Sequence, residues 1–108
     1  MFFRRKRSKE QVEKTDYPFE DSPNTASIIC RHIVHEGKPV LYVSHDEEDG
    51  MWQFMCGCTH NTEDAMVVAL KEVYDRDSSV GALSQMPCGY YAERETQNSD
   101  WVIRKDQG

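Results

Sequence analysis

ASIICRHIVHEGKPVLYVSHDEEDGMWQFMC, residues 26–56, contains three runs rich in β-branched and aromatic side chains. Such residues favour the pleated surface of a sheet. The runs span residues 26–34, 40–44 and 51–56. The two connections between them contain glycine, proline or consecutive acidic residues, which are typical of turns. This stretch therefore predicts three consecutive antiparallel strands joined by short turns.

A helix is expected directly after these strands. Thr62 is followed by two acidic residues, and both features favour the beginning of a helix. The apolar residues Met66, Leu70 and Val73 then recur every three to four positions, which is the period of a helix face. We expect one main helix over residues 63–76, packed on one face of the sheet.

The remainder of the chain predicts a short helical turn and two further strands. Asp77 or Ser78 can cap the turn, and Pro87 limits its length. The strands are expected at residues 89–95 and 101–104. The predicted fold class is therefore α+β, an antiparallel sheet of about five strands in the order βββαββ with one main helix on one face.

Charge is distributed unevenly along the 108 residues. The net charge is −6, yet residues 1–14 hold six cations and two anions, so this segment is +4 and the remaining residues are −10. Affinity for phosphates comes mainly from Lys and Arg, so an acidic body makes a nucleic-acid binder improbable. A weak contact with nucleic acid could come only from the basic run Arg4, Arg5, Lys6 and Arg7.

Two regions follow from this distribution. Residues 1–25 are expected to form a basic and then proline-containing tail, and residues 26–108 a single α+β domain. The longest strictly apolar run is six residues, at 65–70, whereas a bilayer core requires roughly 20. We therefore expect no membrane span, and a cytoplasmic protein because no secretory signal is visible.

Cysteine and histidine alternate in a way that suggests metal ligation. Cys56, Cys58 and His60 would share one face of an extended segment, and Cys30 and His32 would share another. The predicted metal site uses Cys56, Cys58 and His60 with Cys30 or Cys88. The favoured interpretation is instead that the thiols are reduced and simply pack in the sheet, because the paired knuckle spacing of structural zinc sites is missing, so the metal site is the alternative.

Enzymatic activity is not expected. The chain contains several residues that could pair as nucleophile and base, but nothing in the sequence fixes their geometry. They are His32, His35, His45 and His60 with Cys30, Cys56, Cys58 and Cys88. Phosphate-binding glycine loops and the common hydrolase motifs are also missing from the sequence, so no catalytic residue and no cofactor is predicted.

The densest charge feature is the acidic run Asp46, Glu47, Glu48 and Asp49. It does not match a calcium loop of the EF-hand type, because Cys56 stands where the last ligand should be Glu. An acidic surface attracts a basic partner and accelerates the encounter. These four residues are therefore the predicted partner-binding surface.

The sequence also resembles a small bacterial domain family of unknown function, which overlaps immunity proteins of polymorphic toxin systems. The resemblance spans about residues 26–104. It rests on Ile29-Cys30-Arg31-His32-Ile33, Gly37-Lys38-Pro39-Val40-Leu41-Tyr42, Asp49-Gly50-Met51-Trp52-Gln53-Phe54-Met55-Cys56-Gly57, Asp77, Leu83, Pro87, Gly89, Ala92 and Arg94. The family implies no catalytic residues.

Two functional hypotheses follow. The first is a non-enzymatic cytoplasmic protein-binding domain, of the immunity type that the resemblance implies, whose acidic surface contacts a basic partner such as a toxin. The second is a metal-binding or thiol-dependent protein that uses Cys56, Cys58 and His60. The sequence leaves the oligomeric state open.

Overall fold

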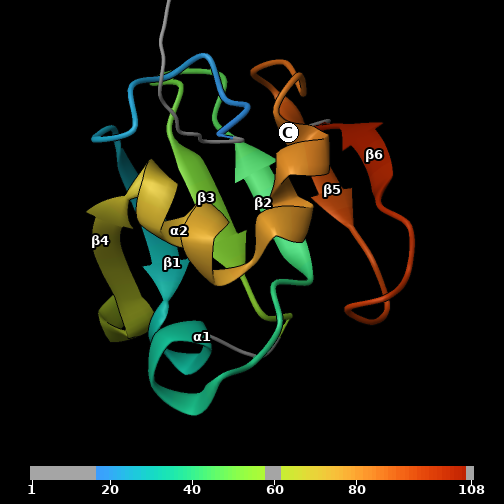
Figure 1. Ribbon diagram of the computed structural model, residues 1–108. Coiled ribbons are helices and arrows are strands. Elements are labelled where there is room, and N and C mark those ends of the chain that lie inside the picture. Colours follow the sequence, from blue (N-terminus) through green and yellow to red (C-terminus); the bar gives the residue numbers. More distant parts are fainter. Residues whose placement is uncertain (1–16, 58–61, 107–108) are drawn as a thin grey trace, which may run out of the picture.

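A six-stranded sheet in the order β4-β1-β3-β2-β5-β6 forms the body of the protein, with helices at one end and across one face (Figure 1). The computed structural model describes residues 17–57 and 62–106. The strands are β1 (Ala26–Cys30), β2 (Tyr42–His45), β3 (Trp52–Met55), β4 (Ala65–Ala69), β5 (Tyr90–Glu93) and β6 (Val102–Lys105). The helices are α1 (Arg31–Glu36) and α2 (Leu70–Arg76), with the 3-10 turns η1 (Thr62–Asp64) and η2 (Ser78–Leu83). The predicted α+β class is confirmed. The predicted sheet of about five strands in the order βββαββ with one main helix is wrong, because the sheet has six strands and the chain order is βαβββαββ.

The first predicted strand, at residues 26–34, is wrong in its second half. β1 ends at Cys30, and residues 31–36 form α1. Ile33 would be buried whether this segment were a strand or a helix. Its β-branched side chain alone therefore does not decide between the two conformations. Gly37 does decide, because its left-handed backbone, φ 71°, ends the helix and lets its N–H donate to the carbonyl of His32.

Because α1 intervenes, β1 and β2 do not form a hairpin, and the predicted meander and purely antiparallel sheet are also wrong. β1 pairs in parallel with β3, with Ile28 opposite Gln53. β2 lies on the other side of β3, antiparallel to it, and pairs with β5 as well. The sheet is therefore mixed, and β1 and β3 end at the same edge, beside α1 (Figure 1).

The predicted helix over residues 63–76 is also wrong in its first half. Residues 65–69 form β4, which pairs antiparallel with β1 along its whole length, and only Leu70–Arg76 is α-helical. The backbone donors and acceptors along the outer side of β1 need hydrogen-bond partners. Pairing with them stabilises residues 65–69 as a strand more than the local helix preference stabilises them as a helix. The Leu70 N–H donates to the carbonyl of Thr25 at 2.8 Å, so the beginning of α2 is also bonded to the chain before β1.

The hydrophobic core lies where α2 covers the sheet (Figure 1). Trp52 and Phe54 of β3 and Leu70 and Val73 of α2 are each at most 1% exposed. Phe19, in the segment that the sequence assigns to the tail, is also buried, and its ring centroid lies 5.1 Å from that of Trp52. The short turn predicted after α2 is η2, where the Asp77 carboxylate accepts from the Ser79 N–H at 3.1 Å.

Arg94, just after β5, fixes the segment between α1 and β2. It is 8% exposed, and its guanidinium donates to the carbonyl of Val40 from Nε at 3.0 Å and from Nη2 at 2.8 Å. The same group pairs with Asp77 at 3.1 Å and lies 4.1 Å from the centroid of the Trp101 ring. This contact anchors the chain that leaves α1, and no sequence pattern predicts it.

None of the helices in residues 17–57 and 62–106 has the length and apolar character needed to cross a membrane.

Candidate metal centre

Cysteine and histidine side chains meet at both ends of β3. Cys56 directly follows this strand and lies near Cys30 and His32. Trp52 begins the strand, and its ring is stacked on His45, which in turn contacts Cys88. We call the first set the buried cluster (Cys30, His32 and Cys56) and the second the exposed pair (His45 and Cys88).

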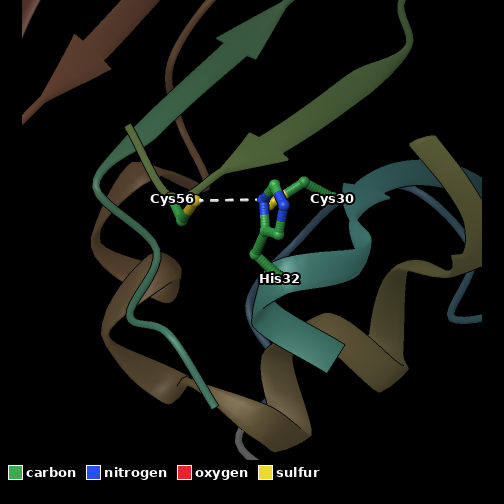
Figure 2. A group of neighbouring side chains, drawn as sticks. All are labelled: Cys30, His32 and Cys56. Atoms are coloured by element: carbon green, nitrogen blue, oxygen red, sulfur yellow. Dashed lines mark hydrogen bonds between the residues drawn. The ribbon is translucent and has the colours of Figure 1, made fainter. Parts of the chain in front are cut away.

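The parallel pairing of β1 and β3 creates the buried cluster. Cys30 is the last residue of β1 and Cys56 follows the end of β3, so both thiols lie at the same edge of the sheet. His32 lies in the first turn of α1, and Figure 2 shows its imidazole next to Cys30, with one ring nitrogen facing the sulfur of Cys56. One potential ligand atom from each of the three residues lies within 4.8 Å of the other two.

The distances in the buried cluster are close to those of a tetrahedral zinc site. Zinc binds sulfur at about 2.3 Å and imidazole nitrogen at about 2.0 Å, so two such ligands lie about 3.6 Å apart and two sulfurs about 3.8 Å. Cys56 Sγ and His32 Nδ1 are 3.7 Å apart. The two other pairs need to contract by at most about 1.2 Å.

The surroundings of the buried cluster also suit a soft or borderline metal ion. Cys30 is 0% and Cys56 4% exposed, while His32 is half-buried. Sulfur and imidazole ligands select zinc and similar ions over calcium or magnesium, which prefer oxygen. Elsewhere among the described residues, no other set of three potential ligands is as close together.

The sequence predicted part of this cluster. Cys56 is a predicted ligand, and Cys30 is one of the two residues that could complete the predicted site. The sequence also predicts that His32 shares a strand face with Cys30. His32 instead comes from α1. Cys58 and His60 lie outside the described residues, and Cys88 contacts His45 at the other end of β3. The missing signal was the parallel pairing, which brings together residues 26 positions apart.

The sequence does not predict the exposed pair either. Its two residues are 43 positions apart, and only the fold brings them together. Cys88 Sγ lies 3.6 Å from Nε2 of His45. Nδ1 of the same ring lies 2.8 Å from the carbonyl oxygen of Met86. The ring is also stacked on Trp52, with centroids 3.8 Å apart and planes at 15°.

The acidic run at residues 46–49 forms a tight turn before β3. The Asp46 carboxylate accepts from the Glu48 N–H at 2.7 Å, and the Asp49 carboxylate accepts from the Met51 N–H at 2.9 Å. These bonds leave the side chains of Glu47, Glu48 and Asp49 exposed. The predicted partner-binding residues therefore lie together on the surface.

An open hollow of about 420 Å³ lies beside this turn. Its lining includes His45, Gly89 and four carboxylates, those of Asp46, Glu47, Glu48 and Asp106. Tyr42 lines it too, and burial raises the pKa of the Tyr42 hydroxyl, with the Asp106 carboxylate raising it further. The hollow is thus an acidic environment next to the exposed pair.

Comparison with known proteins adds no relative: the chain matches no family model, no curated protein and no solved structure.

Proposed function

We propose that this protein binds a transition-metal ion, with zinc as the best fit, through Cys30, His32 and Cys56. The observation that supports it is the convergence of two buried sulfurs and an imidazole from three different elements, all within 4.8 Å. Packing of thiols in a sheet does not by itself require an imidazole beside them. The distance of 3.7 Å between Cys56 Sγ and His32 Nδ1 is the one expected for two ligands of the same zinc ion.

The location of the cluster indicates what the ion does. It would link the end of β3 to the end of β1 and to the beginning of α1, which follows β1 directly. The backbone pairing of β1 with β3 covers only two positions. Because a preformed site does not exist in the unfolded chain, the free energy of metal binding adds to the free energy of folding. We propose that the ion stabilises the junction of these three elements.

Metal content is the direct test. The full chain is purified without a metal-chelating tag, loaded with zinc, dialysed and measured by elemental analysis. We expect one equivalent in the parent protein and less than a tenth in Cys30→Ser, His32→Asn and Cys56→Ser. Cys88→Ser is the matched control, because it also removes a thiol but lies at the other end of β3.

Cobalt provides a second measurement that reports the ligands themselves. Cobalt bound in a tetrahedral site with thiolate ligands gives intense visible and near-ultraviolet absorption, which ligation by oxygen does not give. The spectrum should lose intensity in Cys30→Ser and Cys56→Ser and stay unchanged in Cys88→Ser. Cys58→Ser and His60→Asn test the two other ligands that the sequence predicts. A parent protein that binds neither ion would refute the proposal.

A second candidate function is supported by the acidic turn. We propose that residues 46–49 form a contact surface for a basic protein, in line with the resemblance to immunity proteins of the cytoplasm. The specific observation is that the turn is held by its own carboxylates, those of Asp46 and Asp49, while Glu47, Glu48 and Asp49 are exposed. A preordered acidic surface costs little entropy when a cationic partner binds.

This second candidate can be tested with a cationic peptide of ten lysines followed by nuclear magnetic resonance. We expect amide shifts to change at residues 46–49 and to disappear at high salt, because exposed charges are screened. Glu47→Lys combined with Glu48→Lys should abolish the shifts, while the control Glu72→Lys on α2, also an exposed glutamate, should keep them. Shifts that are spread evenly over the surface would contradict a dedicated contact.

A further inference from the structure

The exposed pair has the geometry of a reactive thiol. Of the three cysteines that the structure describes, Cys30 and Cys56 are buried and Cys88 is exposed. Cys88 Sγ lies 3.6 Å from His45 Nε2, which is within hydrogen-bond distance for sulfur. A thiol becomes a nucleophile when it loses its proton, so an acceptor at this distance is the first requirement.

The orientation of His45 makes Nε2 the acceptor. The Met86 carbonyl can only accept a hydrogen bond, so His45 Nδ1, 2.8 Å away, must be the nitrogen that bears the hydrogen. In the neutral ring Nε2 then has its lone pair directed at the thiol. The arrangement of nucleophile, base and orienting group is the one that thiol chemistry uses.

The pair is also held rigidly. The His45 ring is stacked on Trp52, which is 1% exposed, at a centroid distance of 3.8 Å. The backbone carbonyl of His45 accepts from the Gly89 N–H at 2.7 Å, so the chain on both sides of Cys88 is bonded to the same residue. A fixed acceptor needs little reorganisation before proton transfer.

The charge around the pair selects the reactant. Glu47 lies over Gly89, with a carboxylate oxygen 3.3 Å from the position that a Cβ of residue 89 would occupy. Asp46, Glu48 and Asp106 line the same hollow with His45. Negative potential concentrates cations and repels anions near a reacting group. A cationic small molecule therefore has access to Cys88 that an anionic one lacks.

We infer that Cys88 undergoes thiol–disulfide exchange with small cationic disulfides, with His45 as the proton acceptor. His45 Nε2 takes the thiol proton, and the Cys88 thiolate attacks one sulfur of the disulfide. A bond forms between that sulfur and Cys88 Sγ as the original sulfur–sulfur bond breaks. The departing sulfur keeps the bonding electron pair and takes the proton from Nε2. One protein thiol and one disulfide thus give one mixed disulfide and one small thiol.

The test compares cystamine, a dication, with glutathione disulfide, an anion, on the full-length folded protein. Adduct formation is followed by intact mass, and the site is found by peptide mapping. Each rate is divided by that of an uncharged model thiol, N-acetylcysteine amide, with the same reagent. We expect a single cysteamine adduct on Cys88, none in Cys88→Ser, and a normalised rate at least about tenfold higher for cystamine than for glutathione disulfide.

His45→Asn separates the role of the base from that of the fold. The asparagine amide can still donate to the Met86 carbonyl but offers no basic nitrogen to the thiol. We expect the cystamine rate to fall at least about tenfold. His35→Asn, on the exposed part of α1, is the matched control and should react like the parent. Thermal unfolding of each variant verifies that it is folded.

Glu47→Gln tests the charge selection. It should reduce the preference for cystamine, and so should added salt. Glu63→Gln is the control and should leave the preference unchanged. Glu63 lies in η1, just before β4, at the end of the sheet that holds Cys30. The proposal is overturned if a folded His45→Asn reacts as fast as the parent, or if the adduct forms on another cysteine. Equal normalised rates for the two disulfides overturn the cationic assignment.

Discussion

The buried cluster and the exposed pair use the same chemical groups at opposite ends of β3, yet they are suited to different chemistry. In the buried cluster two sulfurs and one imidazole converge, and both sulfurs are nearly inaccessible to solvent. In the exposed pair one accessible sulfur faces an imidazole whose other nitrogen is already bonded to a carbonyl. The number of sulfurs and their access therefore distinguish an ion-binding arrangement from a nucleophilic one.

The largest effect on stability is expected in the middle of β3, the strand whose two ends hold the two sites. Phe54 lies in the middle of β3 and is 0% exposed. Phe54→Ala should lower the free energy of unfolding by about 3 to 5 kcal/mol, through lost burial and a cavity, and should disturb both sites at once. Denaturant unfolding measures this loss. Val67→Ala, at a position 69% exposed on β4, is the control and should change stability by less than about 0.5 kcal/mol.

The next effect concerns the labelling rates of the thiols, because Cys88 is exposed to solvent and the other two are buried. With N-ethylmaleimide at neutral pH, Cys88 in the folded protein should be labelled at least about a hundredfold faster than Cys30 and Cys56, which must wait for local opening. Peptide mapping by mass spectrometry follows each site. In denaturant the three rates should become similar. Equal rates in the folded protein would remove the distinction between the two sites.

Zinc should act on one site alone. At a hundredfold excess over the dissociation constant, a ligand that binds only the folded state stabilises it by about 2.7 kcal/mol. We expect the thermal midpoint to rise by several degrees in the parent and in Cys88→Ser, and to remain unchanged in Cys56→Ser. A rise in Cys56→Ser of the same size would place the ion elsewhere.

The smallest change in stability is expected at Trp52, whose ring stacks on His45. The Trp52 indole N–H is buried and has no acceptor among the described residues, so Trp52→Phe removes an unsatisfied donor as well as some buried area. We expect the two changes to offset, with a loss of only about 1 kcal/mol in unfolding free energy. Cys88 should nevertheless react several-fold more slowly, because His45 loses part of its stacking partner. Zinc content should not change.

Local patterns predicted the parts of the molecule that depend on local chemistry. The acidic turn and the capped turn after α2 both follow from neighbouring residues, and the structure has them. The strand at residues 65–69 does not, because its conformation is chosen by the open edge of β1, about 40 positions away. Local helix period and sheet pairing compete there, and the pairing prevails.

Both sites depend on contacts of this second kind. The buried cluster exists because α1 replaces the end of a predicted strand and makes β1 parallel to β3. The exposed pair exists because the chain before β5 returns to the end of β2. Residue types in the sequence identified cysteine and histidine as candidates, but only the topology decides which of them meet.

β6 has a consequence for the time course of reactions at Cys88. All four of its residues are exposed, so the strand has no buried side chain and is joined to the sheet through β5 alone. Such an element unfolds locally at a small fraction of the global cost. The Asp106 N–H, at its end, donates to the carbonyl of Gly89 beside Cys88. Amide hydrogen exchange should therefore be fastest at residues 102–106, and each opening of this strand releases the backbone next to the thiol.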